Sequence, residues 1–232
     1  ILIDTGGIAS YDDKKPYDIA GNITIPYLQA EGIDHLDYLI ITHGDFDHIG
    51  MATNLIKNFK VEKVILNIGD YNDLEQNLIN LLKQKNIPYY QNINKINLEN
   101  SKLEFLNYKE YDNENDNSNI IYIVINNTKL LFMGDAGAEV EEDLLKEYNL
   151  KDIDILKVGH HGSKTSSSKK FINSINPKYS IISVGENNSY GHPNKEVLDN
   201  LANSIIYRTD LDGSVKFTFT KKLQIKIAVE RS

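Results

Sequence analysis

The chain has 232 residues, a formal net charge of −8 and no cysteine. The absence of cysteine excludes disulfides, thiolate zinc sites and a cysteine nucleophile. Hydrophobic residues make up 41% of the chain, which predicts a packed globular fold. The acidic balance gives no sign of a strongly basic face for nucleic acid, and no apolar run reaches the roughly 20 residues of a membrane span.

The first part of the chain is predicted to alternate strands and helices. Apolar spacing indicates, in chain order, a strand at 1–7, a helix at 22–31, a strand at 36–42, a helix at 45–58, a strand at 61–67 and a helix at 73–85.

The remainder continues with mixed elements. Short alternating stretches at 89–108 precede an acidic, asparagine-rich loop at 112–119. A hairpin at 120–125 and 129–133 is closed by Asn126-Asn127, a good turn pair. The pattern then predicts a helix at 139–148, a strand at 153–158, a helix at 167–175, a strand at 179–184, a helix at 194–203 and strands at 205–208, 215–220 and 223–229. No linker divides the chain, so one domain with helices covering sheets is expected.

Four potential metal ligands follow the buried strand at 36–42. They are His43, Asp45, Asp47 and His48, all within six residues. Imidazole and carboxylate together suit a divalent transition metal, and acids packed at the mouth of a buried strand are costly without a cation. The alternative is a helix N-cap formed by one of the aspartates, with both histidines at the surface. Four ligands in one hexapeptide favour the metal site.

Two further strand ends carry side chains of the same kind. Asp135 follows an apolar strand and a glycine, where its two oxygens can bridge two cations; a helix cap is the alternative. His160 and His161 lie between two glycines, which permit close approach of the backbone to a ligand. At most one of these rings easily faces a given ion, so the other is available for substrate; a solvent loop is the alternative.

His192 follows the strand at 179–184, within Tyr-Gly-His-Pro. It could bind metal or transfer a proton to the leaving group, and a structural role is the alternative. His35 lies among acids and is expected at the surface.

The order His-x-Asp-x-Asp-His, Gly-Asp and His-His-Gly-Ser resembles the motif series of the metallo-β-lactamase superfamily. The resemblance implies an α+β fold, an αββα four-layer sandwich with the site along one edge. The usual first motif is His-x-His-x-Asp-His, and here Asp45 stands at the second histidine. That departure, together with Lys-x-x-His-His-Gly-Ser, Gly-His-Pro and the opening Ile-Asp-Thr-Gly-Gly, resembles the carboxy-terminal hydrolase domain of the ComEC competence proteins, which are bacterial membrane proteins of DNA uptake.

The chain departs from that family in three places. The strand and Asp-Val-Gly-Gln-Gly-Asp turn that usually come first are missing, so residues 1–232 are expected to be one hydrolase domain, excised from a longer membrane protein and lacking its first strand. Met51 replaces a common glycine. No histidine lies between His48 and His160, so one metal site is poor in nitrogen ligands.

The resemblance implies a site with two divalent ions, Mn²⁺ or Zn²⁺. One ion would be held by His43 and Asp45, and the other by Asp47 and His48 with His161. Asp135 would bridge both, His160 would lie beside them as ligand or phosphate contact, and Asp4 would orient the ligand loop. An aspartate in place of histidine makes one site harder, so Mn²⁺ is expected to compete well. Paired cations can activate water for phosphodiester hydrolysis. Asp47, His160 and His192 would be catalytic, with His192 protonating the leaving oxygen, and the phosphate contacts would be Ser163, Lys164 and Ser166.

The implied function is a metal-dependent phosphodiester hydrolase, a nuclease domain that degrades the DNA strand that is not imported. Its partners would be DNA, expected to be single-stranded, and the channel portion of the same parent protein, with this domain on the extracytoplasmic face of the membrane. One alternative is a phosphodiesterase for small or cell-wall substrates, which the net charge of −8 favours. Another is a degenerate regulatory or DNA-guiding module, in view of the missing histidine motif.

Overall fold

The computed structural model describes residues 1–8, 16–99, 101–106, 109–219 and 225–230. The chain forms two compact units. The first unit comprises residues 1–93 and 108–119, and the second comprises residues 94–107 and 120–232. The single domain expected from the sequence stays a prediction.

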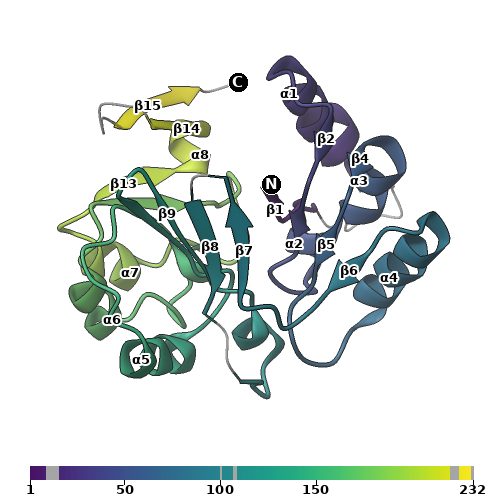
Figure 1. The fold of residues 1–232 in the computed structure, drawn as a ribbon. Helices are drawn as coiled ribbons and strands as arrows, with labels where there is room; N and C mark the ends of the chain where they lie inside the picture. Colours follow the sequence, from purple (N-terminus) through teal and green to yellow (C-terminus); the bar gives the residue numbers. More distant parts are fainter. Residues whose placement is uncertain (9–15, 100, 107–108, 220–224, 231–232) are drawn as a thin grey trace. The chain divides into compact units, whose positions relative to one another are not determined.

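The first unit contains a parallel sheet with strand order β1-β3-β5-β6 (Figure 1). Strands β2 and β4 form a separate parallel pair. In the chain, β2 directly precedes β3 and β4 directly precedes β5. Fully buried aliphatic side chains such as Leu39, Ile40 and Leu66 form its core. The strands are β1 (Leu2–Ile3), β2 (His35–Leu36), β3 (Leu39–Ile40), β4 (Lys60–Val61), β5 (Val64–Ile65) and β6 (Tyr89–Tyr90).

The helices of the first unit partly match the sequence pattern. The helix expected at 45–58 is divided at Gly50 and Met51, because Met51 leaves the helical conformation and its amide donates to the carbonyl of Gly6. The strand expected at 36–42 is likewise divided into β2 and β3. The helices are the π-helical turn η1 (Ala20–Thr24), α1 (Ile25–Ala30), α2 (Phe46–Ile49), α3 (Ala52–Asn58), α4 (Asp73–Lys85) and the short 3₁₀ turn η2 (Glu114–Asn117).

The second unit is built on a mixed sheet with strand order β13-β12-β11-β10-β9-β8-β7. Strands β7 to β10 pair antiparallel, and β10 to β13 pair parallel. Asn126 and Asn127 close the β9–β10 hairpin with φ of 49° and 65°, as the sequence predicts. The strands are β7 (Lys95–Leu98), β8 (Ser101–Phe105), β9 (Ile121–Ile125), β10 (Thr128–Phe132), β11 (Ile155–Lys157), β12 (Tyr179–Ile182) and β13 (Ile205–Arg208), followed by an antiparallel pair, β14 (Ser214–Phe219) and β15 (Ile225–Glu230).

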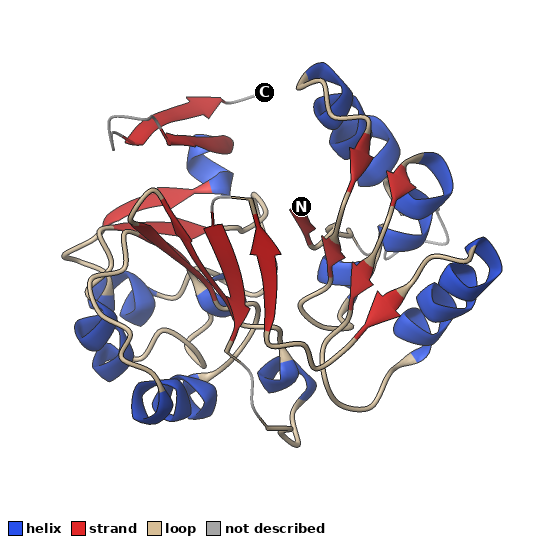
Figure 2. Ribbon diagram, in the orientation of Figure 1, coloured by secondary structure: helices blue, strands red, loops and turns tan. Residues whose placement is uncertain are grey.

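Helices connect the parallel strands of this sheet in order. Crossovers between parallel strands have one preferred hand, and three successive crossovers in one direction place their helices on the same face. Figure 2 shows α5, α6 and α7 together on one side of the sheet. The loop that leads from each parallel strand into the next helix follows the carboxyl end of that strand. The helices are α5 (Ala138–Glu147), the 3₁₀ turn η3 (Gly159–Gly162), α6 (Lys169–Ile175), α7 (Lys195–Asn200) and α8 (Thr209–Asp212), the last of which the sequence pattern did not predict.

No helix in the described ranges is long and apolar enough to cross a bilayer. Positions 100, 107, 108, 220, 223 and 224 of the expected alternating stretch and strands lie outside the described residues.

Candidate metal centre

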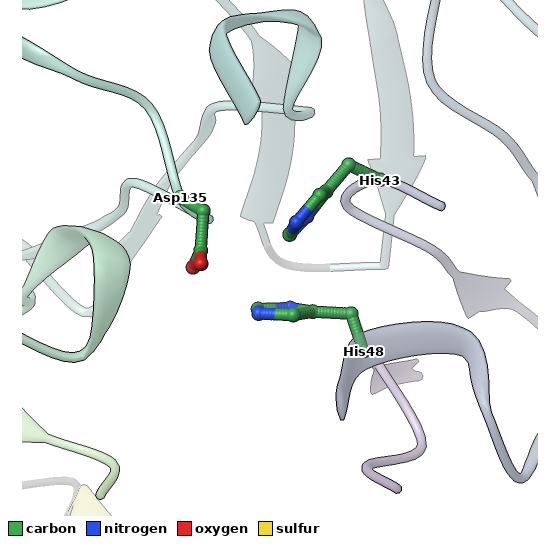
Figure 3. Close-up of side chains that lie close together, drawn as sticks. All are labelled: His43, His48 and Asp135. Atoms are coloured by element: carbon green, nitrogen blue, oxygen red, sulfur yellow. The ribbon is translucent and has the colours of Figure 1, made fainter. Parts of the chain in front are cut away.

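Two histidine rings of the first unit lie against each other. His43 follows β3 and His48 lies in α2, and their ring centroids are 4.2 Å apart at an interplanar angle of 52° (Figure 3). His43 is fully buried and His48 is nearly so. The short connection from the buried strand to α2 therefore gathers both rings at the end of the sheet.

Asp4 contacts the Nδ1 side of the His48 ring. The Oδ2 atom of Asp4 lies 2.8 Å from Nδ1 of His48, and the same carboxylate accepts hydrogen bonds of 2.7 Å from both the amide and the hydroxyl of Thr42. A carboxylate partner places the ring proton on Nδ1, which leaves the lone pair of Nε2 for a metal ion. Asp4 adopts a positive φ of 58°, so its own backbone is in an uncommon conformation where it makes these contacts.

The Nε2 atom of His43 is a buried polar atom that forms no hydrogen bond within the described part of the chain. The opposite ring nitrogen, Nδ1, lies 3.2 Å from the hydroxyl of Thr42, and Oδ2 of Asp45 is 3.5 Å from Nε2. A buried donor or acceptor without a partner costs about 1–3 kcal/mol. A divalent cation on Nε2 removes this cost, so the residues present fit the metal site that the sequence predicts.

The aspartates of the motif lie at the start of α2. Asp45 occupies the N-cap position, but within the described residues its side chain accepts no capping hydrogen bond. Its side chain is about half exposed, at 48%. Asp47 lies in the first turn of the same helix. The capping alternative for Asp45 therefore has no support in the geometry.

Glu75 is a buried acid next to this loop that the sequence reasoning missed. It is fully buried in the first turn of α4, and burial raises its pKa to about 7, with a smaller contribution from Glu114. Its Oε2 atom accepts a 2.8 Å hydrogen bond from the amide of Asn72. A cation bound at His43 would oppose this rise in the pKa of Glu75. The protonation state of Glu75 would therefore depend on whether the ligand loop holds a cation.

Asn72 ties helix α4 to the ligand loop, and it was also missed. Its Oδ1 atom caps the helix by accepting from the amides of Leu74 and Glu75, while Nδ2 donates to the carbonyl of Gly44 at 2.9 Å and to Glu114 at 3.0 Å. A Cβ on Gly44 would lie 2.4 Å from Nδ2 of Asn72, so a larger residue there would displace this side chain. The capping-box pattern Asn-x-x-Glu was the available sequence signal.

In the second unit, two histidines lie near one carboxylate. Asp135 is buried after β10 (Figure 3), and its Oδ2 atom lies 3.7 Å from Nε2 of His160 and 3.5 Å from Nε2 of His161. The sequence predicts that at most one of these rings easily faces a given ion, and this stays a prediction. Both residues adopt a left-handed conformation, with φ of 47° and 52°.

Backbone and hydroxyl partners orient these two rings. Nδ1 of His161 lies 2.7 Å from the carbonyl of Ser183, so that nitrogen carries the proton and Nε2 is left for a metal. Nδ1 of His160 lies 3.1 Å from the hydroxyl of Thr165. Gly162 has φ of 80°, and a Cβ there would lie 2.6 Å from Pro193. The loop therefore requires glycine at this position.

The predicted phosphate contacts differ in their surroundings. The hydroxyl of Ser166 is buried and donates to the carbonyl of Gly159 at 2.8 Å, and that of Ser163 is buried 3.0 Å from the hydroxyl of Thr165. Lys164 is exposed. Both serines hold the loop in place, and a role for these residues in phosphate contact stays a prediction.

His192 packs against this histidine loop. Its ring centroid lies 6.0 Å from that of His160. Burial, and then the neighbouring His160 and His161, lower the pKa of His192, while Asp135 opposes the shift. His35, expected at the surface, has a partly exposed side chain whose Nδ1 atom lies 2.5 Å from Asp34.

The family model of the metallo-beta-lactamase superfamily matches residues 1–186. The chain is 32% identical to ComE operon protein 3 of Bacillus subtilis over 96% of its own length and 30% of that protein. It is also 32% identical to competence protein ComA of Neisseria gonorrhoeae, over 94% of its own length and 29% of that protein. The chain thus spans under a third of the length of these two relatives.

A solved structure gives the same fold. The metallo-beta-lactamase fold protein YhfI from Bacillus subtilis aligns with a TM-score of 0.50 over 88% of each chain, at 12% identity. Together with the family match, this confirms the expected α+β class and the resemblance on which it depended.

Proposed function

The chain belongs to the metallo-beta-lactamase superfamily, and on this premise we propose that it is a metal-dependent phosphodiester hydrolase that acts on DNA. The family supports a metal-dependent hydrolase. The choice of DNA is supported by the similarity to a protein named for competence. We further propose that the strand degraded is the one that is not imported.

We propose that the chain binds two divalent ions. The ligands would be His43, Asp45, Asp47, His48, Asp135 and His161. The observation that carries this proposal is the hydrogen bonding of the histidine ring nitrogens. In His48 and His161 the Nδ1 atom already has an acceptor, and in His43 the buried Nε2 atom forms no hydrogen bond within the described residues. Rings fixed in this way present Nε2 for coordination.

Bound divalent cations lower the pKa of water and stabilise negative charge on phosphoryl oxygens. The chain's own residues orient the ligands and handle protons. Asp4 and the carbonyl of Ser183 hold two of the imidazoles, so little reorganisation is needed when substrate binds. His192 would give a proton to the leaving oxygen. Its lowered pKa makes the protonated ring a stronger acid but a less populated one at neutral pH.

A nicking assay tests the proposal. The full chain is incubated with single-stranded DNA and Mn²⁺, and strand cleavage is followed on a denaturing gel. We expect cleavage that a chelator abolishes, and we expect Asp47→Ala and His48→Ala to lose it while the far-ultraviolet circular dichroism is unchanged. His35→Ala is the matched control, because it removes a histidine that lies beside Asp34 on the surface. Cleavage that persists in chelator would overturn the proposal.

The net charge of −8 favours a second candidate, a phosphodiesterase for small or cell-wall substrates. Parallel measurement of kcat/KM on a chromogenic phosphodiester and on single-stranded DNA distinguishes the two. A degenerate regulatory module would bind no metal after dialysis.

We propose finally that this chain is the hydrolase domain of a longer membrane protein and faces the extracytoplasmic side, with the channel portion of the same protein as its partner. The support is that the chain covers only 30% and 29% of the length of ComE operon protein 3 and competence protein ComA. Protease accessibility of the domain in intact cells carrying the parent protein tests this placement.

A further inference from the structure

An aromatic ring is displayed on the loop between β12 and α7. Tyr190 is 77% exposed, more than any other large apolar or aromatic side chain of the described residues. Its ring stacks on that of His192, with centroids 5.8 Å apart and an interplanar angle of 19°. One face of the tyrosine is thus supported by the imidazole, and the side chain is otherwise largely open to solvent.

The loop that carries this pair is held by side-chain and backbone bonds. Nδ2 of Asn188 donates to the carbonyl of His192 at 2.8 Å, and the amide of His192 donates to Oδ1 of Asn188 at 3.0 Å. The amide of Asn194 donates to the carbonyl of Gly162 at 2.8 Å, which attaches the loop to the histidine turn. The loop is therefore fixed by polar contacts, and burial of Tyr190 contributes little to its stability.

The stacked pair continues toward the candidate metal ligands of the same unit. His192 lies 6.0 Å from His160 between ring centroids, and Nε2 of His160 lies 3.7 Å from the carboxylate of Asp135. The rings of His192 and His160 therefore lie between Tyr190 and Asp135, and a planar group stacked on Tyr190 would lie at the outer end of this series.

We infer that Tyr190 and His192 form a stacking platform for a nucleobase of a single-stranded nucleic acid. This inference rests on the proposed function, because it names the substrate feature that the phosphodiester hydrolase site would recognise. Stacking of bases on aromatic side chains is tolerant of sequence, since every base has a π-face. A substrate that is cut without sequence preference could be held in this way.

The surroundings of Tyr190 favour a base over an apolar protein partner. The neighbouring positions in the chain are Asn187, Asn188, Ser189 and Gly191. An aromatic anchor in a protein interface is usually encircled by other contacts that exclude water. A single supported ring among polar residues offers one flat face, which is what a base requires.

A binding assay with matched strands tests the inference. The full chain in Mn²⁺ is titrated into fluorescent single strands of about 12 nucleotides, and anisotropy is read. The strands carry a phosphorothioate backbone to resist hydrolysis. One strand carries bases, and the other carries abasic tetrahydrofuran residues throughout.

We expect Tyr190→Ala to weaken binding of the base-carrying strand by roughly 5- to 150-fold, the range of one stacked base. Tyr190→Phe should retain binding, since the ring is kept. The abasic strand should bind equally to the wild-type chain and to Tyr190→Ala. Tyr27→Ala is the matched control, because it removes a 53% exposed tyrosine from α1 in the first unit.

Equal affinity of the wild-type chain and Tyr190→Ala for the base-carrying strand would overturn the inference, as would a wild-type chain that does not distinguish the two strands or binds neither. The proposed function is judged separately, by cleavage of an ordinary phosphodiester. If the chain binds bases but does not cleave DNA, the hydrolase proposal is wrong and the stacking platform stands. If it cleaves DNA but its binding does not depend on the bases, the platform is wrong and the hydrolase proposal stands.

Discussion

The buried acid of helix α4 leads to a stability prediction that needs no substrate. Glu75 is fully buried, and burial is the main reason that its pKa rises from the ordinary 4.5 to about 7. Glu75→Gln keeps the shape of the side chain and an oxygen that can accept from the amide of Asn72, and it stays neutral at every pH.

The magnitude follows from the difference between the folded and unfolded pKa values. Below about pH 4.5 the carboxyl is neutral in both states and contributes nothing. Between about pH 4.5 and 7 the unfolded chain has released the proton while the folded chain retains it, so rising pH lowers the free energy of unfolding. The pKa values differ by about 2.5 units, and at about 1.36 kcal/mol per unit the loss reaches about 3 kcal/mol near pH 8. Glu75→Gln should therefore match the wild-type chain near pH 4.5 and be more stable by up to this amount near pH 8.

Urea unfolding followed by circular dichroism measures the difference, with EDTA present because a bound cation near His43 would favour the carboxylate. Asp73→Asn is the matched control, because it removes an exposed carboxylate from the same helical turn. It corrects for the lost interaction with the helix dipole, about 0.3–1 kcal/mol. If Glu75→Gln were less stable than the wild-type chain near pH 8 by more than this control, Glu75 would be a charged and satisfied group, and the reasoning from burial would be wrong.

Three further predictions concern the ligand loops. Asp4→Asn should weaken metal binding about 10- to 100-fold, measured by competition with a chromogenic chelator, because the carboxylate that fixes the ring proton of His48 is lost; unchanged affinity would contradict the role of Asp4. Asn72→Ala and Asn194→Ala each remove a helix cap and should each cost about 1 kcal/mol in urea unfolding. Only Asn72→Ala should also weaken metal binding, because Asn72 bonds to Gly44 through its side chain, whereas Asn194 bonds to Gly162 through its backbone amide, which the substitution retains. Gly162→Ala should lower the thermal midpoint, since its φ of 80° and a Cβ 2.6 Å from Pro193 leave no room for a methyl group; an unchanged midpoint would show that the loop can adjust.

Some elements could be predicted from the sequence because their signals are local. Helix α4 begins and ends where the pattern placed it, because Asn72 and Glu75 form a capping box and Asn86 ends the helix in a left-handed conformation. The Asn126-Asn127 turn was predicted for the same kind of reason. The motif at 43–48 could be identified because its unusual density of ligands is visible within six residues.

Other features depend on contacts distant in the chain. The division between α2 and α3 depends on the bond from Met51 to Gly6. The burial of Glu75 could not be predicted, because a glutamate in the first turn of a helix is ordinarily a solvated residue near the positive end of the dipole. The two successive left-handed residues His160 and His161 are a backbone feature that a pattern of residue types does not encode.

The central claim is that the predicted histidine and aspartate ligands bind two metal ions. Elemental analysis of the dialysed full chain, alongside His43→Ala and Asp135→Ala, tests it most directly. We predict about two Mn or Zn ions per wild-type chain and a loss of bound metal in each variant, because His43→Ala removes an imidazole ligand and Asp135→Ala removes the carboxylate proposed to bridge the ions. A metal-free wild-type chain, or an Asp135→Ala variant with the full metal content of the wild type, would contradict the account.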